Sequence, residues 1–198
     1  MNENKELILL ETFKLLMTRS FDSITVCDIE HATGLSRGAL FYHFRNKEDI
    51  FRQVLDYYTV IMHRLDFGAR YVETDTLYDC IHNFVKAARK LVKNGKSLLG
   101  IENVERAYFR FLLQAVKQYP DFCKKFTQSY DEQTRFWEKM VRKAQAGGEV
   151  RAGIDPLETA KHFRYIYVGM SLEKTLDSGI DSRELLHAMM AYYDVIKA

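Results

Sequence analysis

Apolar residues recur every three to four positions along nearly the whole chain, and this spacing constrains the fold more than any other feature. Near the N-terminus Leu9, Phe13 and Leu16 follow the interval, which puts them on one face of an α-helix. Only 2 prolines and 10 glycines occur among 198 residues, too few for the many turns of an all-β sandwich. The sequence therefore predicts an all-α protein.

Capping residues divide this pattern into about nine helices. Asp155 is expected to cap a helix that has Pro156 at its first position and Glu158 in its first turn. Glycine- or proline-containing pairs are expected to separate the longer helices, at Asn94-Gly95, Tyr119-Pro120, Gly147-Gly148 and Ser178-Gly179. The expected helices span residues 5–18, 26–33, 37–44, 47–65, 75–93, 101–119, 121–146, 156–178 and 181–197, with a connection at 67–75.

Two domains follow from the helix lengths. Residues 1–46 hold three short helices, which we predict to form a helix-turn-helix DNA-binding domain. Residues 47–198 hold the longer helices, which we predict to form a helical ligand-binding and dimerisation domain. The first domain is too small to be very stable alone, so the helix beginning at Lys47 is expected to join it to the larger body.

The most informative segment runs from Thr25 to Lys47. Thr25 is placed to cap one helix, Gly34 to end it, and Ser36 to begin the next. Two short helices joined by such a turn predict a helix-turn-helix, whose second helix enters the DNA major groove. The spacing of Leu40 and Phe44 puts them on the core side of that second helix.

Positive charge is concentrated on the helix that would face DNA. The whole chain carries 29 basic and 27 acidic residues, for a net charge of +2, so any site for a polyanion must be a local patch. Between Arg37 and Lys47 the sequence has Arg37, Arg45, Lys47 and His43 but no acid. This segment therefore favours contact with a nucleic acid.

The run from Gly34 to Lys47, read as GLSRGALFYHFRNK, is similar to the most typical segment of TetR-family transcriptional regulators. Residues 6–51 resemble the N-terminal DNA-binding domain of that family. Residues 148–156, in the rest of the chain, are also similar to the family, but more weakly. The resemblance implies contacts with bases or phosphates, with Arg37 reading guanine and Lys47 contacting the backbone. The implied DNA-binding residues are Thr25, Ser36, Arg37, Gly38, Ala39, Phe41, Tyr42, His43 and Lys47. Phe41 stands where the family usually has tyrosine, and its ring also suits the core.

The family resemblance further implies a homodimer, a palindromic DNA operator and repression relieved by a small-molecule effector. The two C-terminal helices are apolar on more than one side, so a second subunit is expected to cover one side of them. The candidate dimerisation residues are Phe163, Tyr167, Met170, Leu185, Met189, Tyr192 and Ile196. An apolar or aromatic ligand is expected, since aromatic residues make up 13% of the chain. The candidate ligand-binding residues are Phe84, Tyr108, Phe109, Tyr130 and Trp137.

Two other functions remain open on the sequence. An all-α enzyme would need a nucleophile, metal or phosphate-binding motif, and none is recognisable, so we expect no enzyme. A ligand-independent DNA-binding protein would share every N-terminal feature. Three scattered cysteines, the lack of an apolar run of about 20 residues and a polar N-terminus predict a cytoplasmic protein without membrane contact. No cofactor and no metal are expected.

Overall fold

The structure is a computed structural model that describes residues 2–64 and 67–198. Within these ranges the chain forms α-helices and short 3-10 turns, and its only β pairing is an isolated bridge between Val150 and Lys197. The helices are α1 (Glu3–Thr18), α2 (Val26–Thr33), α3 (Arg37–His43), α4 (Lys47–Arg64), α5 (Leu77–Leu99), α6 (Val104–Gln118), α7 (Pro120–Ala146), α8 (Pro156–Glu173) and α9 (Ser182–Ile196). The predicted all-α fold is confirmed.

The chain divides into two compact units, Met1–Arg64 with Ala107–Cys123 and Leu65–Arg106 with Lys124–Ala198. The predicted domains, 1–46 and 47–198, stay a prediction. The packing units differ from them because α4 and most of α6 pack with the N-terminal helices. Helices α6 and α7 each have residues in both units.

The first unit packs α1 against α4 and the C-terminal part of α6 around aromatic rings. The Phe13 ring lies edge-on to Phe111, at 5.1 Å between centroids, and Tyr58 stacks on Phe111 at 5.4 Å. The side chain of Gln114 accepts a hydrogen bond from the backbone N–H of Phe21 at 2.6 Å. Long-range contacts thus attach α6 to α1, to α4 and to the turn that follows α1.

The local caps predicted for the short helices are confirmed. The Thr25 side chain accepts from the backbone N–H of Asp28, and the Asp28 carboxylate accepts from the backbone N–H of Thr25, which makes a capping box. Gly34 ends α2 with φ of +70°, a conformation that costs glycine little. Ser36 caps α3, and the Asn46 side chain accepts from the N–H of Asp49 at the start of α4.

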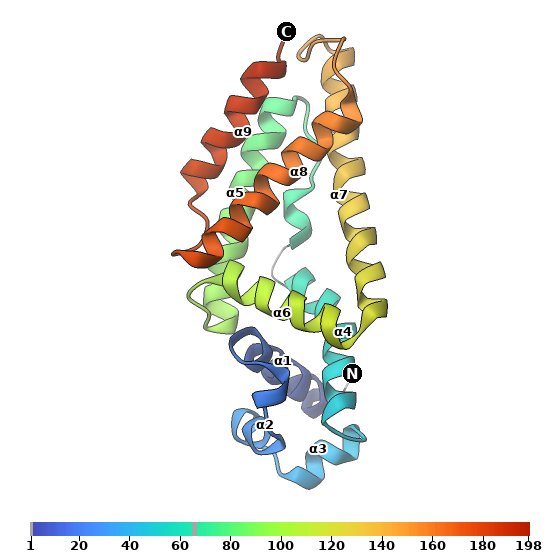
Figure 1. Ribbon diagram of the computed structural model, residues 1–198, viewed down its shortest axis with the longest axis vertical. Helices are drawn as coiled ribbons and strands as arrows, with labels where there is room; N and C mark the ends of the chain where they lie inside the picture. Colours follow the sequence, from blue (N-terminus) through green and yellow to red (C-terminus); the bar gives the residue numbers. More distant parts are fainter. Residues whose placement is uncertain (1, 65–66) are drawn as a thin grey trace. The chain divides into compact units, whose positions relative to one another are not determined.

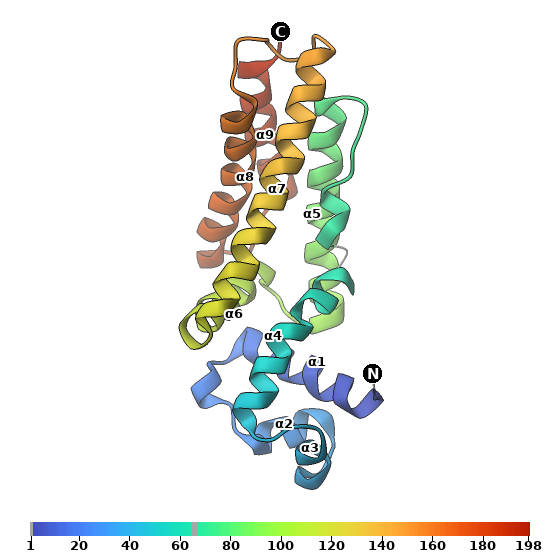
Figure 2. The same ribbon diagram turned by 90° about the vertical axis from the view of Figure 1, so that its right-hand side faces the viewer.

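In the second unit α5, α7, α8 and α9 run side by side, as Figures 1 and 2 show. Their shared core is apolar, and Trp137 of α7 stacks on Phe163 of α8 with 4.9 Å between ring centroids. Leu185 and Met189 bring α9 into the same core with no exposed surface. Residues remote in sequence therefore build this unit.

The helix end predicted at Asn94-Gly95 is wrong, and the helix predicted over residues 156–178 already ends at Glu173. The pair Asn94-Gly95 does not end α5, which continues to Leu99. A Cβ atom added to Gly95 would lie 2.8 Å from a methyl carbon of Val104, so the glycine allows the first turn of α6 to approach α5 closely. Gly95 therefore serves packing inside a helix, which its sequence neighbours do not reveal.

The turn between α8 and α9 is held by the start of α6. The Asn103 side chain donates to the carbonyl of Asp177 at 2.7 Å, and Arg106 donates to the carbonyl of Thr175 at 2.6 Å. Between them Glu105 is buried, and burial raises the pKa of its carboxyl. None of the helices in the described ranges is both long and apolar enough to cross a bilayer.

Candidate nucleic-acid interface

Helix α3 separates a buried face from an exposed one. Leu40 is fully buried and Phe44 is 3% exposed, whereas Tyr42 is 83% exposed. Arg37 and Gly38, in the first turn, are also exposed. The predicted division of this helix between core and outer face is confirmed for these residues. An exposed first turn is the part of a recognition helix that approaches base edges.

Phe41 lies on the exposed side, so the expectation that its ring belongs to the core is wrong. It is 37% exposed, and the Arg37 guanidinium lies over its ring at 5.8 Å. His43 is half-buried, with its ring edge-on to Tyr42 at 4.9 Å. The aromatic side chains therefore border the basic side chain instead of filling the space beneath it.

An ion pair fixes the start of α2. Arg19 donates to Asp28 at 2.6 Å and also to the carbonyl of Ser23 at 2.6 Å. The Arg19 guanidinium, and after it the Thr25 hydroxyl and N–H, hold the pKa of the Asp28 carboxyl well below its usual range. Arg19 therefore helps to hold Thr25, a candidate phosphate contact, in place through Asp28. The sequence reasoning did not identify Arg19.

Lys47 is already engaged within the first unit. Its ammonium group donates to the carbonyls of Phe21 and Ile24, at 3.1 and 2.9 Å, and lies 4.3 Å from the centre of the Phe21 ring. An ammonium group has three donors, so two bonds to carbonyls leave one for a phosphate. Lys47 therefore links α4 to the turn before α2, a structural role that its place in the motif did not reveal.

A hollow of about 370 Å³ opens beside α3. It is lined by Phe41, Tyr42, His43, Phe44, Arg45, Asp49, Arg52 and Gln53. Asp49 organises it, because its carboxylate accepts from the N–H of Arg45 at 3.0 Å and from the side chain of Arg52 at 2.9 Å. These donors, the Arg45 N–H first, lower the pKa of Asp49 to about 2. Arg52 and Gln53 lie three and four residues after Asp49, a helical spacing that could have identified them.

The candidate ligand-binding residues are divided between the two units. Phe84 and Trp137 are buried in the core of the second unit, with 5.2 Å between ring centroids. Tyr130 is half-buried in the same unit, where the Arg164 guanidinium lies 5.3 Å from its ring centre. Tyr108 and Phe109 belong to the first unit and are half-buried. Three of the five therefore share one unit.

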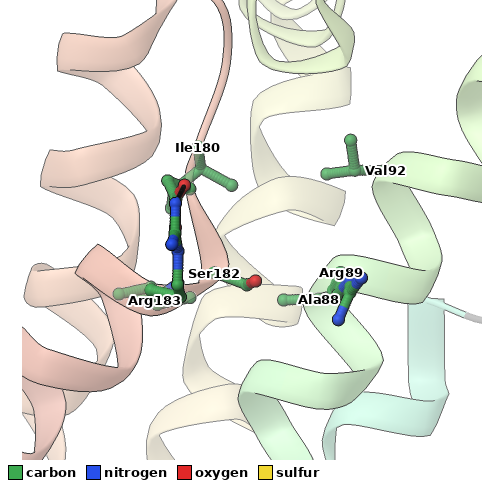
Figure 3. Close-up of a pocket in the computed structure, with 8 residues that line it drawn as sticks. Ala88, Arg89, Val92, Ile180, Ser182 and Arg183 are labelled. Carbon is green, nitrogen blue, oxygen red and sulfur yellow. Dashed lines mark hydrogen bonds and ion pairs between the residues drawn. The ribbon is translucent and has the colours of Figure 1, made fainter.

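A second hollow, of about 430 Å³, lies between α5 and the start of α9 (Figure 3). Its lining is Ala88, Arg89, Val92, Ile180, Asp181, Ser182, Arg183 and Leu185. Arg89 comes from α5 and Arg183 from α9, on either side of Ser182. None of the candidate ligand-binding residues lines it.

The candidate dimerisation residues mostly face the core of their own chain. Phe163, Leu185, Met189 and Ile196 are at most 3% exposed within the second unit. Tyr167, Met170 and Tyr192 are half-buried and pack against the same core. The first four residues therefore belong to the core of their own chain and not to its surface. Apolar side chains that are exposed on α8 and α9 include Tyr165, Leu172 and Val195.

No group of three or more metal-ligating side chains gathers among the residues that the structure describes. The three cysteines, all within the described ranges, form no disulfide.

Residues 8–54 match the bacterial regulatory proteins of the tetR family. A curated relative, the uncharacterized HTH-type transcriptional regulator YerO of Bacillus subtilis (strain 168), is 34% identical over 58 residues. That match covers 29% of this chain and 20% of the relative, so the chain spans about a fifth of the length of the curated relative it matches.

Solved structures are similar over the whole chain. A TetR-family transcriptional regulator from Cytophaga hutchinsonii matches with a TM-score of 0.73 at 14% identity, over 100% of this chain and 98% of that one. A transcriptional regulator from Saccharomonospora viridis, in complex with choline, matches with a TM-score of 0.72 at 17% identity, over 100% of both chains. At sequence identities of 14% and 17%, the similarity to these two structures shows that the chain shares their fold.

Proposed function

We propose that this chain is a TetR-family transcriptional regulator and acts as a homodimeric repressor of a palindromic operator. Residues 8–54 match the tetR family, and the fold matches that of a solved TetR-family regulator. A small molecule with an aromatic or apolar body, bound in the second unit, releases this chain from DNA. The observation that carries the proposal is the exposed first turn of α3, with Arg37 outward and Leu40 buried beneath it.

Arg37 is the proposed base-reading residue. Its planar guanidinium matches the two acceptors of guanine in the major groove. Gly38 and Ala39 allow the backbone to approach DNA, and Tyr42 and His43 reach neighbouring bases or phosphates. Thr25, Ser36 and Lys47 border this surface and contact the phosphate backbone, and the Phe41 ring packs against the Arg37 guanidinium.

Exposed apolar side chains of α8 and α9 support a homodimer. Leu172 is 53% exposed and Val195 is 63% exposed. A second copy of the chain would cover them in a two-fold interface, which would also carry two recognition helices to successive major grooves. Half-sites of a palindrome lie about 34–36 Å apart, one helical turn of DNA.

An effector in the second unit lowers operator affinity by favouring a conformation that does not fit the half-site spacing. A coupling free energy of about 1–3 kcal/mol changes the affinity roughly 5- to 150-fold. The solved relative with choline supports small-molecule binding on this fold. A DNA partner implies a cytoplasmic location.

The alternatives are weaker. The matched family and relatives are transcriptional regulators and not enzymes, so an all-α enzyme is disfavoured. A ligand-independent DNA-binding protein differs only in the second unit. A ligand that raises the melting temperature without changing operator affinity would favour it.

Selection of bound DNA from a random duplex pool, at two salt concentrations, tests the proposal. A palindrome with two half-sites is expected, whereas salt-labile binding to any duplex would contradict it. With the selected site, Arg37→Ala should relax base preference. Lys47→Ala should weaken binding to all sequences alike and flatten the salt slope by about 1. Circular dichroism must show that Lys47→Ala is folded, because Lys47 also links α4 to the carbonyls of Phe21 and Ile24.

A further inference from the structure

The second unit contains a cluster of basic and phenolic side chains that operator binding does not use. Arg70, directly before Tyr71 and only 2% exposed, is the most buried charged residue of the part of the chain that the structure describes. Arg164, in the middle of α8, is half-buried. Tyr130 of α7 and Tyr167 of α8 lie beside these two arginines.

Aromatic rings surround both guanidinium groups. Arg70 lies 4.7 Å from the ring centre of Tyr167 and 5.5 Å from that of Phe84. Arg164 lies 5.3 Å from the ring centre of Tyr130 and 4.6 Å from that of its neighbour Tyr165. For Arg164, rings on the guanidinium face leave its edge, which carries the N–H donors, available for acceptors in the same plane.

The two arginines act on a common neighbour. Burial raises the pKa of the Tyr71 hydroxyl to about 12, the charges of Arg70 and Arg164 oppose this, and the phenols of Tyr167 and Tyr130 reinforce it. All four groups therefore lie within electrostatic reach of Tyr71.

Arg164 has an unused donor inside this cluster. Its Nε atom is buried and has no hydrogen-bond partner among the residues that the structure describes. A buried donor is normally paired, and a guanidinium edge fits the two oxygens of a carboxylate or two oxygens of a phosphate. The missing acceptor is thus an anion of small size.

We propose that the effector of this protein is an organic acid, whose carboxylate or phosphate binds the edge of Arg164 beside Tyr71 and Tyr130. Its aromatic or apolar body packs on the rings around Phe84. The inference deepens the proposed effector site and rests on it. The inference also implies that the effector is not a cation. The rings of Tyr71, Phe84 and Tyr167, which could bind a cation, already face the Arg70 guanidinium.

The chain has one tryptophan, which gives a direct readout. Trp137 lies 5.2 Å from Phe84 between ring centroids, so its fluorescence reports on the second unit. The probes are 2-naphthoate and 2-naphthyl phosphate, with 2-naphthamide as the neutral control and choline as the cationic one. We expect at least one acid to bind roughly tenfold or more tightly than the amide and choline.

Three arginine variants locate the acid. Arg164→Gln should weaken binding of the acid roughly tenfold and leave the amide unchanged. Arg183→Gln removes the same charge from the same unit at a side chain that is 93% exposed, and should leave both unchanged. Arg164→Lys keeps the charge but not the planar fork, and should lie between wild type and Arg164→Gln.

Three outcomes would overturn the inference. They are no binding of either acid to the wild type, equal binding of acid and amide, and a loss in Arg183→Gln instead of Arg164→Gln. The last would move the site to the hollow of Figure 3. The acid and amide comparison uses the wild type, so it stands even if Arg164→Gln does not fold.

Operator binding is measured separately, which keeps the two proposals distinct. An acid that binds through Arg164 without changing operator affinity contradicts the proposed release mechanism and supports the acid site. Release of the operator by the amide or choline, with no response to either acid, supports the release mechanism and overturns the acid site.

Discussion

The segment from Thr25 to Arg52 and the core of the second unit are held together in different ways. In the first, key hydrogen bonds join residues three or four apart, as in Thr25 with Asp28 and Asp49 with Arg52. In the second, Trp137 stacks on Phe163 and Phe84 meets Tyr167 edge-on, so the partners come from different helices. Bonds of short range follow from spacing rules, whereas apolar contacts between helices depend on how the helices pack.

Gly34 and Gly95 show the same difference between local interactions and packing between helices. Gly34 ends α2 through its own backbone conformation, and the sequence alone predicts that role. Gly95 sits inside α5 to make room for Val104, a role that only its spatial neighbour explains.

The largest expected effect is in the core of the second unit. Trp137→Ala should lower the free energy of unfolding by about 3–5 kcal/mol, because it removes a buried ring that stacks on Phe163. Urea unfolding followed by circular dichroism measures the change, and Trp137→Phe should lose much less. A loss below about 1 kcal/mol would mean that the core repacks freely, and the contrast between the two regions would fail.

Asp49 tests the local region. Its folded pKa, about 2, lies below the usual value of 3.8, so its carboxylate stabilises the fold above about pH 4. That contribution disappears as the pH falls towards 2, and it amounts to at most about 2 kcal/mol once solvent screening is considered.

Asp49→Asn should therefore be less stable than wild type at pH 6, and the difference should shrink between pH 4 and 2. Melting temperatures across this range measure it. Asp75→Asn, at a fully exposed carboxylate, is the matched control and should leave the pH profile unchanged. A gap between Asp49→Asn and wild type that is constant with pH would contradict the assigned role of the carboxylate.

Gly95→Ala tests close packing between helices. The new methyl group would lie 2.8 Å from a Val104 methyl carbon, so we expect a loss of between about 1 and 2 kcal/mol despite the better helix propensity of alanine. Urea unfolding gives the value. In a Val104→Ala background the same substitution should become neutral or stabilising. The same loss in both backgrounds would rule out the contact with Val104 as its cause.

Thr25→Ala should have the smallest effect. Removing the cap of α2 should cost about 1 kcal/mol, whereas Thr25→Ser keeps the oxygen and should cost little. Thermal unfolding compares them. Operator binding should fall in Thr25→Ala more than in Thr25→Ser if the hydroxyl also contacts a phosphate. Identical stability of the two variants would show that the capping box is not needed.

Much of the fold was predictable because the helix ends carry local signals. Asp155 with Pro156 marks the start of α8 as expected, and Asp181 likewise caps α9. The site was partly predictable. Leu40 and Phe44 are buried as their spacing predicts, but Phe41 is exposed and Lys47 bonds to two carbonyls of its own unit. The spacing of residues along the chain predicts neither departure, because each depends on residues of another segment.

The sequence by itself determined the all-α class, the helix caps and the two-helix motif with its acid-free basic stretch. These properties depend on residues within one or two helical turns of each other. Only the tertiary structure decided that Phe163, Leu185 and Met189 belong to the core of their own chain, and that Arg70 and Arg164 lie near one tyrosine. The physical reason is that an apolar face must be buried, but its spacing does not say which surface buries it.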